Sequence, residues 1–160
     1  MDRDALVRSL ALTPDLLEGF IANCPDELID RRRGGGLWSV REHAVHLAAV
    51  QPMLCGRIEA FRDDPRPTMK PYNPAEEDAA ARSSADLAET LAAFREWRER
   101  QVEILDGLDD AVWSREGVHP GYDRYGLELL AAHIHFHDGF HLYRMEEMAY
   151  VKDGGLTTLP

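Results

Sequence analysis

The stretch from residue 133 to residue 141 reads His133-Ile134-His135-Phe136-His137-Asp138-Gly139-Phe140-His141 and holds four of the seven histidines of the chain. Each residue of an α-helix advances the chain by ~100°, so residues four apart lie nearly above one another. His133, His137 and His141 then form a column along one face of a helix, whereas His135 points to the opposite side. The stretch therefore predicts a long helix with a histidine-rich face.

His137 and His141 stand one turn apart, which is the spacing at which two imidazoles of one helix bind a single metal ion. A catalytic metal site usually takes about three protein ligands and keeps an open position. His46 lies among apolar residues in an earlier predicted helix and is the natural third ligand. A single such histidine is more often a hydrogen-bonded core residue, but the set of three favours a metal site.

Two further histidines lie near these three in the sequence. The helical pitch of ~5.4 Å makes it difficult for His133 to reach the ion that His137 and His141 would bind. We expect His133 to be a pocket residue or a proton shuttle, and a partly buried histidine near the helix start is an equal alternative. His43 precedes His46 by three residues and either lines the pocket or faces solvent; we favour solvent or a contact with the start of its helix.

Four segments carry apolar residues at helical spacing, and they are residues 2–23, 39–61, 83–108 and 126–150. Ser39 followed by Glu42 predicts a capping box. Thr13-Pro14 predicts a kink or restart in the first helix, and Pro52 predicts a bend in the second. No strand pattern is present. The expected fold is all-α: one domain spanning residues 1–160, a bundle of four antiparallel helices with a frayed tail from about residue 153.

The connections between these helices are long. Residues 25–37 contain three consecutive glycines that suit a flexible linker better than a nucleotide-binding loop. Residues 63–81 contain four prolines and cannot form a regular element. Residues 109–125 include aromatic side chains that either grip a small ligand or cap the end of the bundle: Trp113, His119, Tyr122 and Tyr125.

Composition excludes several kinds of partner. The net charge of −11 argues against nucleic-acid binding and against binding to anionic membranes, since both need a basic surface. No run of 18 apolar residues and no signal-peptide core is present. Only two cysteines occur, which favours a reducing compartment, and we expect a cytoplasmic protein.

The pattern Trp38-Ser39-x-x-Glu42-x-x-x-His46-Leu47, followed later by His137-Asp138-x-x-His141-Leu142, resembles the DinB/YfiT-like superfamily of four-helix-bundle proteins. That superfamily includes metal-dependent thiol transferases such as bacillithiol transferases and, more distantly, mycothiol-dependent maleylpyruvate isomerases. The resemblance implies that His46, His137 and His141 are metal ligands. It also implies either transfer of a low-molecular-weight thiol to an electrophile or hydrolysis of a small molecule.

Imidazole ligands suit several divalent metals, and we expect zinc first and nickel next. The expected partners are a small-molecule substrate, such as a low-molecular-weight thiol, and a second copy of the chain in a homodimer. Two alternatives to an enzyme stay open: a non-catalytic metal-binding or partner-binding bundle, and a purely structural bundle. A di-iron carboxylate site is disfavoured because such sites need Glu-x-x-His pairs on two helices, and neither Glu42 nor Glu128 is followed by a histidine three residues later.

Overall fold

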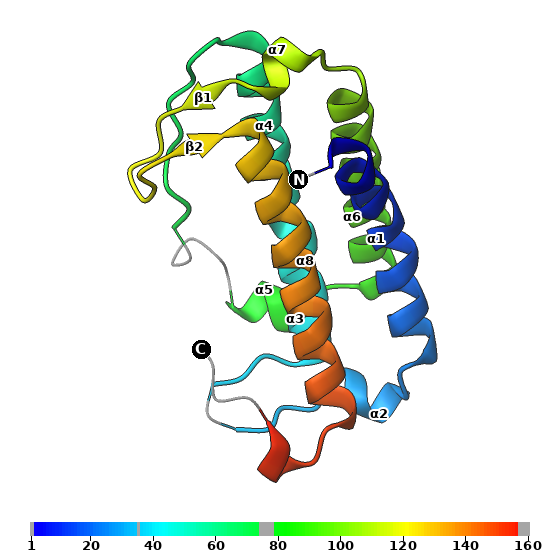
Figure 1. Ribbon diagram of the computed structural model, residues 1–160. Helices are drawn as coiled ribbons and strands as arrows, with labels where there is room; N and C mark the ends of the chain where they lie inside the picture. The colour runs from blue at the N-terminus through cyan, green and yellow to red at the C-terminus, as the bar shows by residue number, and fades with distance from the viewer. Residues whose placement is uncertain (1, 35, 74–78, 157–160) are drawn as a thin grey trace.

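Four long helical segments make up most of the structure, a computed structural model that describes residues 2–34, 36–73 and 79–156 (Figure 1). They are α1 (Arg3–Asn23), the consecutive helices α3 (Val40–Ala49) and α4 (Gln51–Asp63), α6 (Leu87–Asp106) and α8 (Leu127–Tyr150). Shorter elements occupy the connections: α2 (Asp26–Ile29), α5 (Ala79–Ser84), α7 (Asp110–Trp113), β1 (Glu116–Gly117), β2 (Tyr125–Gly126) and the 3-10 helix η2 (Asp153–Gly155). The predicted all-α four-helix bundle is confirmed.

The order of the helices around the bundle differs from the expected antiparallel arrangement. α1 packs against α6 and α8, and the α3–α4 segment packs against the same two helices from the other side. In Figure 1 the chain runs down α1, up α3 and α4, up α6 and down α8. The α3–α4 segment and α6 are therefore parallel neighbours, because the long connection after α4 returns the chain to the end at which α3 began.

Prolines act differently in the first two helical segments. Pro52 lies in the first turn of α4, where its missing N–H costs little, and α3 ends just before it at Ala49. The predicted bend is thus a break between two helices. Pro14 lies inside the continuous helix α1, so the predicted restart is wrong. Its buried neighbours Leu10 and Leu17 hold both halves of that helix against the bundle.

A short hairpin is present where the sequence showed no strand. β1 and β2 pair antiparallel, and each contributes only two residues, too few for a detectable alternation of apolar side chains. An isolated bridge joins Thr68 to Val118 beside this hairpin. The backbones approach so closely that a Cβ atom on Gly117 would lie 2.7 Å from the carbonyl oxygen of Pro67. The two long connections are therefore in direct contact with each other.

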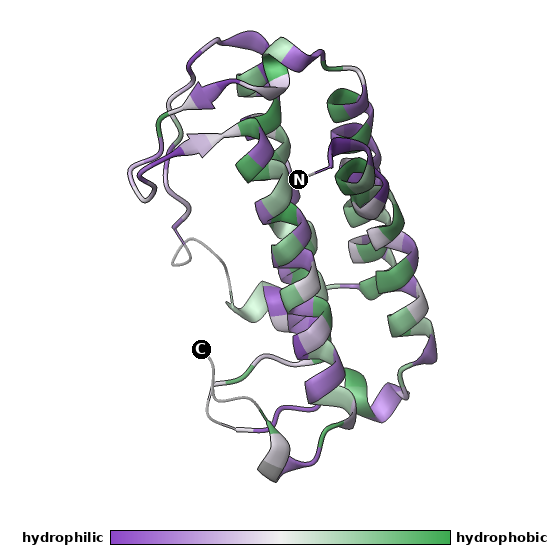
Figure 2. Cartoon of the chain, in the orientation of Figure 1, coloured by the Kyte–Doolittle hydropathy of each residue, from purple (hydrophilic) through white to green (hydrophobic). Residues whose placement is uncertain are grey.

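The interior contains two apolar clusters with a polar layer between them. One cluster joins α4 to the first half of α8, and the other joins α3 to the second half of α8. Figure 2 shows hydrophobic residues along the inner faces of the helices. The layer between the clusters comprises buried polar residues of four helices: His46, Gln51, Arg98, Gln101, Asp138 and His141. Among the described residues, no helix is both long enough and apolar enough to cross a membrane.

Candidate metal centre

The helices bring together the three histidines predicted as ligands. His46 comes from the last turn of α3, and His137 and His141 come from successive turns of α8. One ring nitrogen of each residue lies within 4.8 Å of those of the other two. His46 and His141 are buried, whereas His137 is half-buried. The column of histidines on α8 thus faces α3, as its spacing predicts.

The spacing of these nitrogens fits a divalent ion. In a tetrahedral zinc site with Zn–N bonds of about 2.05 Å, two ligand nitrogens are about 3.3 Å apart. The Nε2 atoms of His46 and His137 are 3.2 Å apart. The rings of His46 and His141 have centroids 4.6 Å apart, and the third nitrogen, on His141, lies within 4.8 Å of the other two. Three imidazoles also leave an open position on the ion.

His43 lies behind the three histidines rather than in solvent. Its side chain is 5% exposed, and its Nδ1 atom lies 2.8 Å from Nδ1 of His141. The expectation that His43 faces solvent is therefore wrong. Residues three apart on a helix share a face, so His43 follows His46 into the interior. Because Nδ1 of His141 is engaged by His43, Nε2 is the atom that His141 can offer to a metal.

The two inner histidines are held in their neutral form. Burial, together with the neighbouring His137, His46 and His43, lowers the pKa of His141 to about 2. Burial and the charge of Arg144 together lower the pKa of His43 to about 3. Metal binding requires neutral imidazole, so the site is in its binding form at neutral pH.

Trp38 covers the outer side of the histidines. Its ring is stacked on that of His141, with centroids 5.9 Å apart, and lies 5.0 Å from that of His46. The guanidinium of Arg82 lies over the other part of the indole, 4.2 Å from its centroid. Glu42, the capping-box residue, pairs with Arg82 at 3.7 Å. Glu42 of the predicted capping box thus also holds Arg82 beside Trp38.

The other two histidines of α8 lie on different faces of the helix, as helical spacing predicts. His133 lies one turn from His137, with ring centroids 5.9 Å apart, and it lines a cavity. Burial lowers the pKa of His133, and the charge of Arg57 adds to this effect. His135 points the other way, and its Nδ1 lies 3.1 Å from the hydroxyl of Ser9 on α1.

A cavity of about 350 Å³ extends from the histidines along α4. Its size suits a small organic molecule. Besides His46, His133 and His137, it is lined by Val50, Met53, Leu54, Arg57, Pro71, Tyr72, His119 and Tyr122. Both long connections therefore contribute to its wall, whereas the contribution of Arg57 was not expected from the sequence. Residues 74–78, the rest of the first connection's predicted loop, lie outside the described residues.

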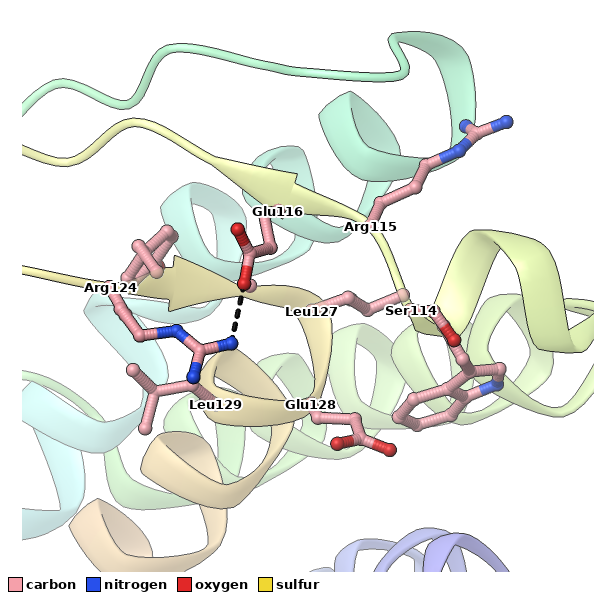
Figure 3. Close-up of a pocket in the computed structure, with 10 residues that line it drawn as sticks. Ser114, Arg115, Glu116, Arg124, Leu127, Glu128 and Leu129 are labelled. Carbon is pink, nitrogen blue, oxygen red and sulfur yellow. Dashed lines mark hydrogen bonds and ion pairs between the residues drawn. The ribbon is translucent and has the colours of Figure 1, made fainter.

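The aromatic residues of the second connection divide between two places. His119 and Tyr122 line the cavity, with rings 4.9 Å apart. Trp113 instead lies at a separate hollow of about 300 Å³ beside the hairpin, where Arg124 and Glu116 form an ion pair at 2.6 Å (Figure 3). The indole N–H of Trp113 donates to the carbonyl oxygen of Leu105. Trp113 therefore closes the end of the bundle and does not contact the site.

Comparisons with known proteins place the chain by its fold and its family. The structure is similar to that of YfiT from Bacillus subtilis, described as a probable metal-dependent hydrolase with an unusual four-helix bundle topology, with a TM-score of 0.83. The two sequences are 24% identical, and the match covers 91% of this chain and 85% of YfiT, so it shows a shared fold. A comparison with curated proteins gave no significant match. The family model of the DinB superfamily matches residues 9–145, and the chain belongs to that superfamily.

Proposed function

We propose that His46, His137 and His141 bind one divalent ion, with zinc the first candidate and nickel the next, and that the protein uses it to transform a small molecule. The observation that carries this proposal is the position of three imidazole nitrogens within 4.8 Å of one another at one end of a cavity of about 350 Å³. A structural site would be closed by a fourth ligand, whereas three histidines beside a cavity leave room for a reactant.

The side chains around the ion have distinct tasks in this proposal. A divalent ion supplies Lewis acidity and lowers the pKa of a water molecule or thiol that occupies its open position. His43 holds the ring of His141 through the contact between their Nδ1 atoms. Trp38 excludes water from the outer side. His133 faces the cavity with a lowered pKa, so its neutral ring is able to accept a proton from a reactant at neutral pH.

Two reactions suit this arrangement. Hydrolysis is supported by the description of YfiT, which shares the fold. Transfer of a low-molecular-weight thiol is supported by the resemblance of the histidine motifs to thiol transferases. In both reactions an ion held by His46, His137 and His141 would activate the nucleophile, and the cavity would hold the electrophile. They differ in whether water or a thiol is consumed.

Metal analysis tests the first part of the proposal. Protein stripped with a chelator is titrated with zinc, nickel and cobalt, and we expect one equivalent of each to bind. The His135→Ala variant is the matched control. It also lacks one histidine of α8, but the ring of His135 contacts Ser9 of α1, so this variant should still bind one equivalent. Binding of less than one equivalent by the wild type would contradict the proposal.

Turnover assays test the second part. The metal-loaded protein is incubated with a p-nitrophenyl ester, and separately with cysteine and monochlorobimane. Ester cleavage without thiol indicates a hydrolase, whereas thiol-dependent bimane conjugation indicates a transferase. Full metal loading with neither reaction, across further esters and thiols, would favour a non-catalytic metal-binding protein.

A further inference from the structure

The cavity beside the histidines has a charged residue at its far end. Val50, Met53 and Arg57 follow His46 at steps of about one turn along α3 and α4, and all four line the cavity. Eleven residues of helix correspond to roughly 16 Å of backbone. The cavity therefore runs lengthwise, with His46 at one end, Val50 and Met53 in the middle and the guanidinium of Arg57 at the other end.

Arg57 differs from most arginines of the structure in what it contacts. Its Nη2 atom donates to the carbonyl oxygen of Lys70 at 2.7 Å, which orients the guanidinium. None of the carboxylates in the described part of the chain lies within ion-pairing distance of it. By contrast, Arg62 on the same helix pairs with Asp63 at 2.7 Å. A charged guanidinium that has no counter-ion among the described residues and is held in position beside a cavity has donors to offer to a ligand.

The other polar groups near Arg57 are also suited to an anion. The described residues that line the cavity include imidazoles and tyrosine hydroxyls but no carboxylate, although the chain has 29 acidic and 18 basic residues. His119 and Tyr122 lie on the connection that faces Arg57. Burial lowers the pKa of His119 and of His133, and the charge of Arg57 lowers both further. The charge of Arg57 is thus felt by His119 and His133 inside the cavity. Both of these neighbours are neutral hydrogen-bonding groups.

We propose that this cavity binds a small organic carboxylate, with the carboxylate on Arg57, the carbon chain along Val50 and Met53, and the reacting group at the histidines. The planar fork of a guanidinium matches the two oxygens of a carboxylate. This inference rests on the proposed function, and it adds the chemical class of the substrate. It also assigns Arg57 as the residue that selects the substrate and sets its orientation.

Cobalt-loaded protein provides the first test. Its visible absorption reports binding of a thiolate, so a series of ω-mercaptocarboxylic acids of increasing length is compared with the corresponding primary amides. At the best length we expect the acid to bind on the order of 10-fold tighter than the amide, since a charge-assisted pair is stronger than a neutral one. Arg57→Gln should reduce this ratio to about one. Arg62→Gln, on the same helix but paired with Asp63, should leave it unchanged.

A second test does not require the metal. Metal-free protein is titrated calorimetrically with hexanoate and with hexanamide, and we expect a preference for hexanoate that Arg57→Gln removes. Equal binding of the two ligands, or a preference that survives in Arg57→Gln, overturns the inference whether or not cobalt binds. If cobalt fails to bind while the hexanoate preference depends on Arg57, the metal function is overturned and the carboxylate site stands.

Discussion

Arg98 of α6 and Asp138 of α8 form an ion pair in the interior of the bundle, with Nη1 2.7 Å from Oδ2. Their side chains are 0% and 1% exposed. Asp138 directly follows His137 in the chain, so the pair fixes α8 from behind the face that carries the candidate ligands. Burial raises the pKa of Asp138, and the charge of Arg98 opposes that shift. The ion pair therefore contributes both to the stability of the bundle and to the position of His137.

Removing the cation of this pair should strongly destabilise the protein. Arg98→Met leaves a buried carboxylate without its partner, and the expected decrease in the free energy of unfolding is about 3–5 kcal/mol. Urea denaturation of the metal-free protein measures it. The double variant Arg98→Met/Asp138→Leu removes both charges and should recover most of the loss. A decrease below about 1 kcal/mol in the single variant would show that the pair does not hold α8.

Each of the three histidines should be necessary for metal binding. His46→Ala, His137→Ala and His141→Ala each leave two ligands, so none should retain one equivalent of metal after gel filtration, as measured by elemental analysis. His135→Ala should retain it, because that ring contacts Ser9 on α1. One ion per chain in the His141→Ala variant would disprove the triad.

His43 should tune the affinity of the site without being a ligand. A group that holds the second nitrogen of a metal-bound imidazole typically contributes 10- to 100-fold to affinity. His43→Ala should therefore weaken zinc binding by roughly that factor while the stoichiometry stays at one. His43→Asn keeps a polar group of similar reach and should recover part of the affinity. Competition with a chromophoric chelator measures both, and an unchanged affinity in His43→Ala would refute this role.

Stability of the metal-free protein should fall below about pH 6.5. In the unfolded chain His43 and His141 protonate near pH ~6.5, but in the folded protein their pKa values are about 3 and about 2. Between these values the unfolded state binds more protons, so acid favours unfolding. The expected slope is at most about 1.4 kcal/mol per pH unit for each histidine.

Urea denaturation at closely spaced pH values between 5 and 8 measures this slope, since carboxylates contribute little above about pH 5. The His43→Asn variant should show a shallower slope, because it retains only one of the two histidines. A free energy of unfolding that stays constant from pH 7 to pH 5 would contradict the burial of neutral imidazoles.

Two aromatic residues of the same connection should behave in opposite ways. Tyr122→Ala removes a wall of the cavity and should weaken binding of a mercaptocarboxylate by on the order of 1–3 kcal/mol with little effect on stability. Trp113→Ala should leave that affinity unchanged but lower the free energy of unfolding by about 3–5 kcal/mol, since the indole is buried in the core. Cobalt absorption titrations and urea denaturation separate the two effects.

Much of this site could be predicted from the sequence, because helical spacing is local information. The column of His133, His137 and His141 requires only a helix, and His46 is marked by its apolar neighbours. The same rule also places His43 on the face of His46, so its burial was predictable from the spacing of three residues. The pairing of α3 with α8 followed from the expectation that an inward-facing histidine of one helix meets two of another, and the resemblance to the DinB superfamily implied the same ligands.

Other features depend on contacts that no local pattern records. Arg98 and Asp138 are forty residues apart, and each looks like an ordinary surface residue of an amphipathic helix. The parallel packing of α6 beside the α3–α4 segment depends on the end at which the long connection returns. Arg57 acquires its significance only when Tyr72 and His119 are brought opposite it by the two connections.

The connection after α4 and the connection after α6 are in contact, and this contact limits how the cavity can change among relatives. The bridge from Thr68 to Val118 and the close approach of Gly117 to Pro67 fasten the two segments to each other. A change in length on either side of this bridge displaces the opposite segment, and with it the residues that this segment contributes to the cavity wall. Relatives with different substrates should therefore differ in both segments at once, while the four helices and their histidines keep the same geometry.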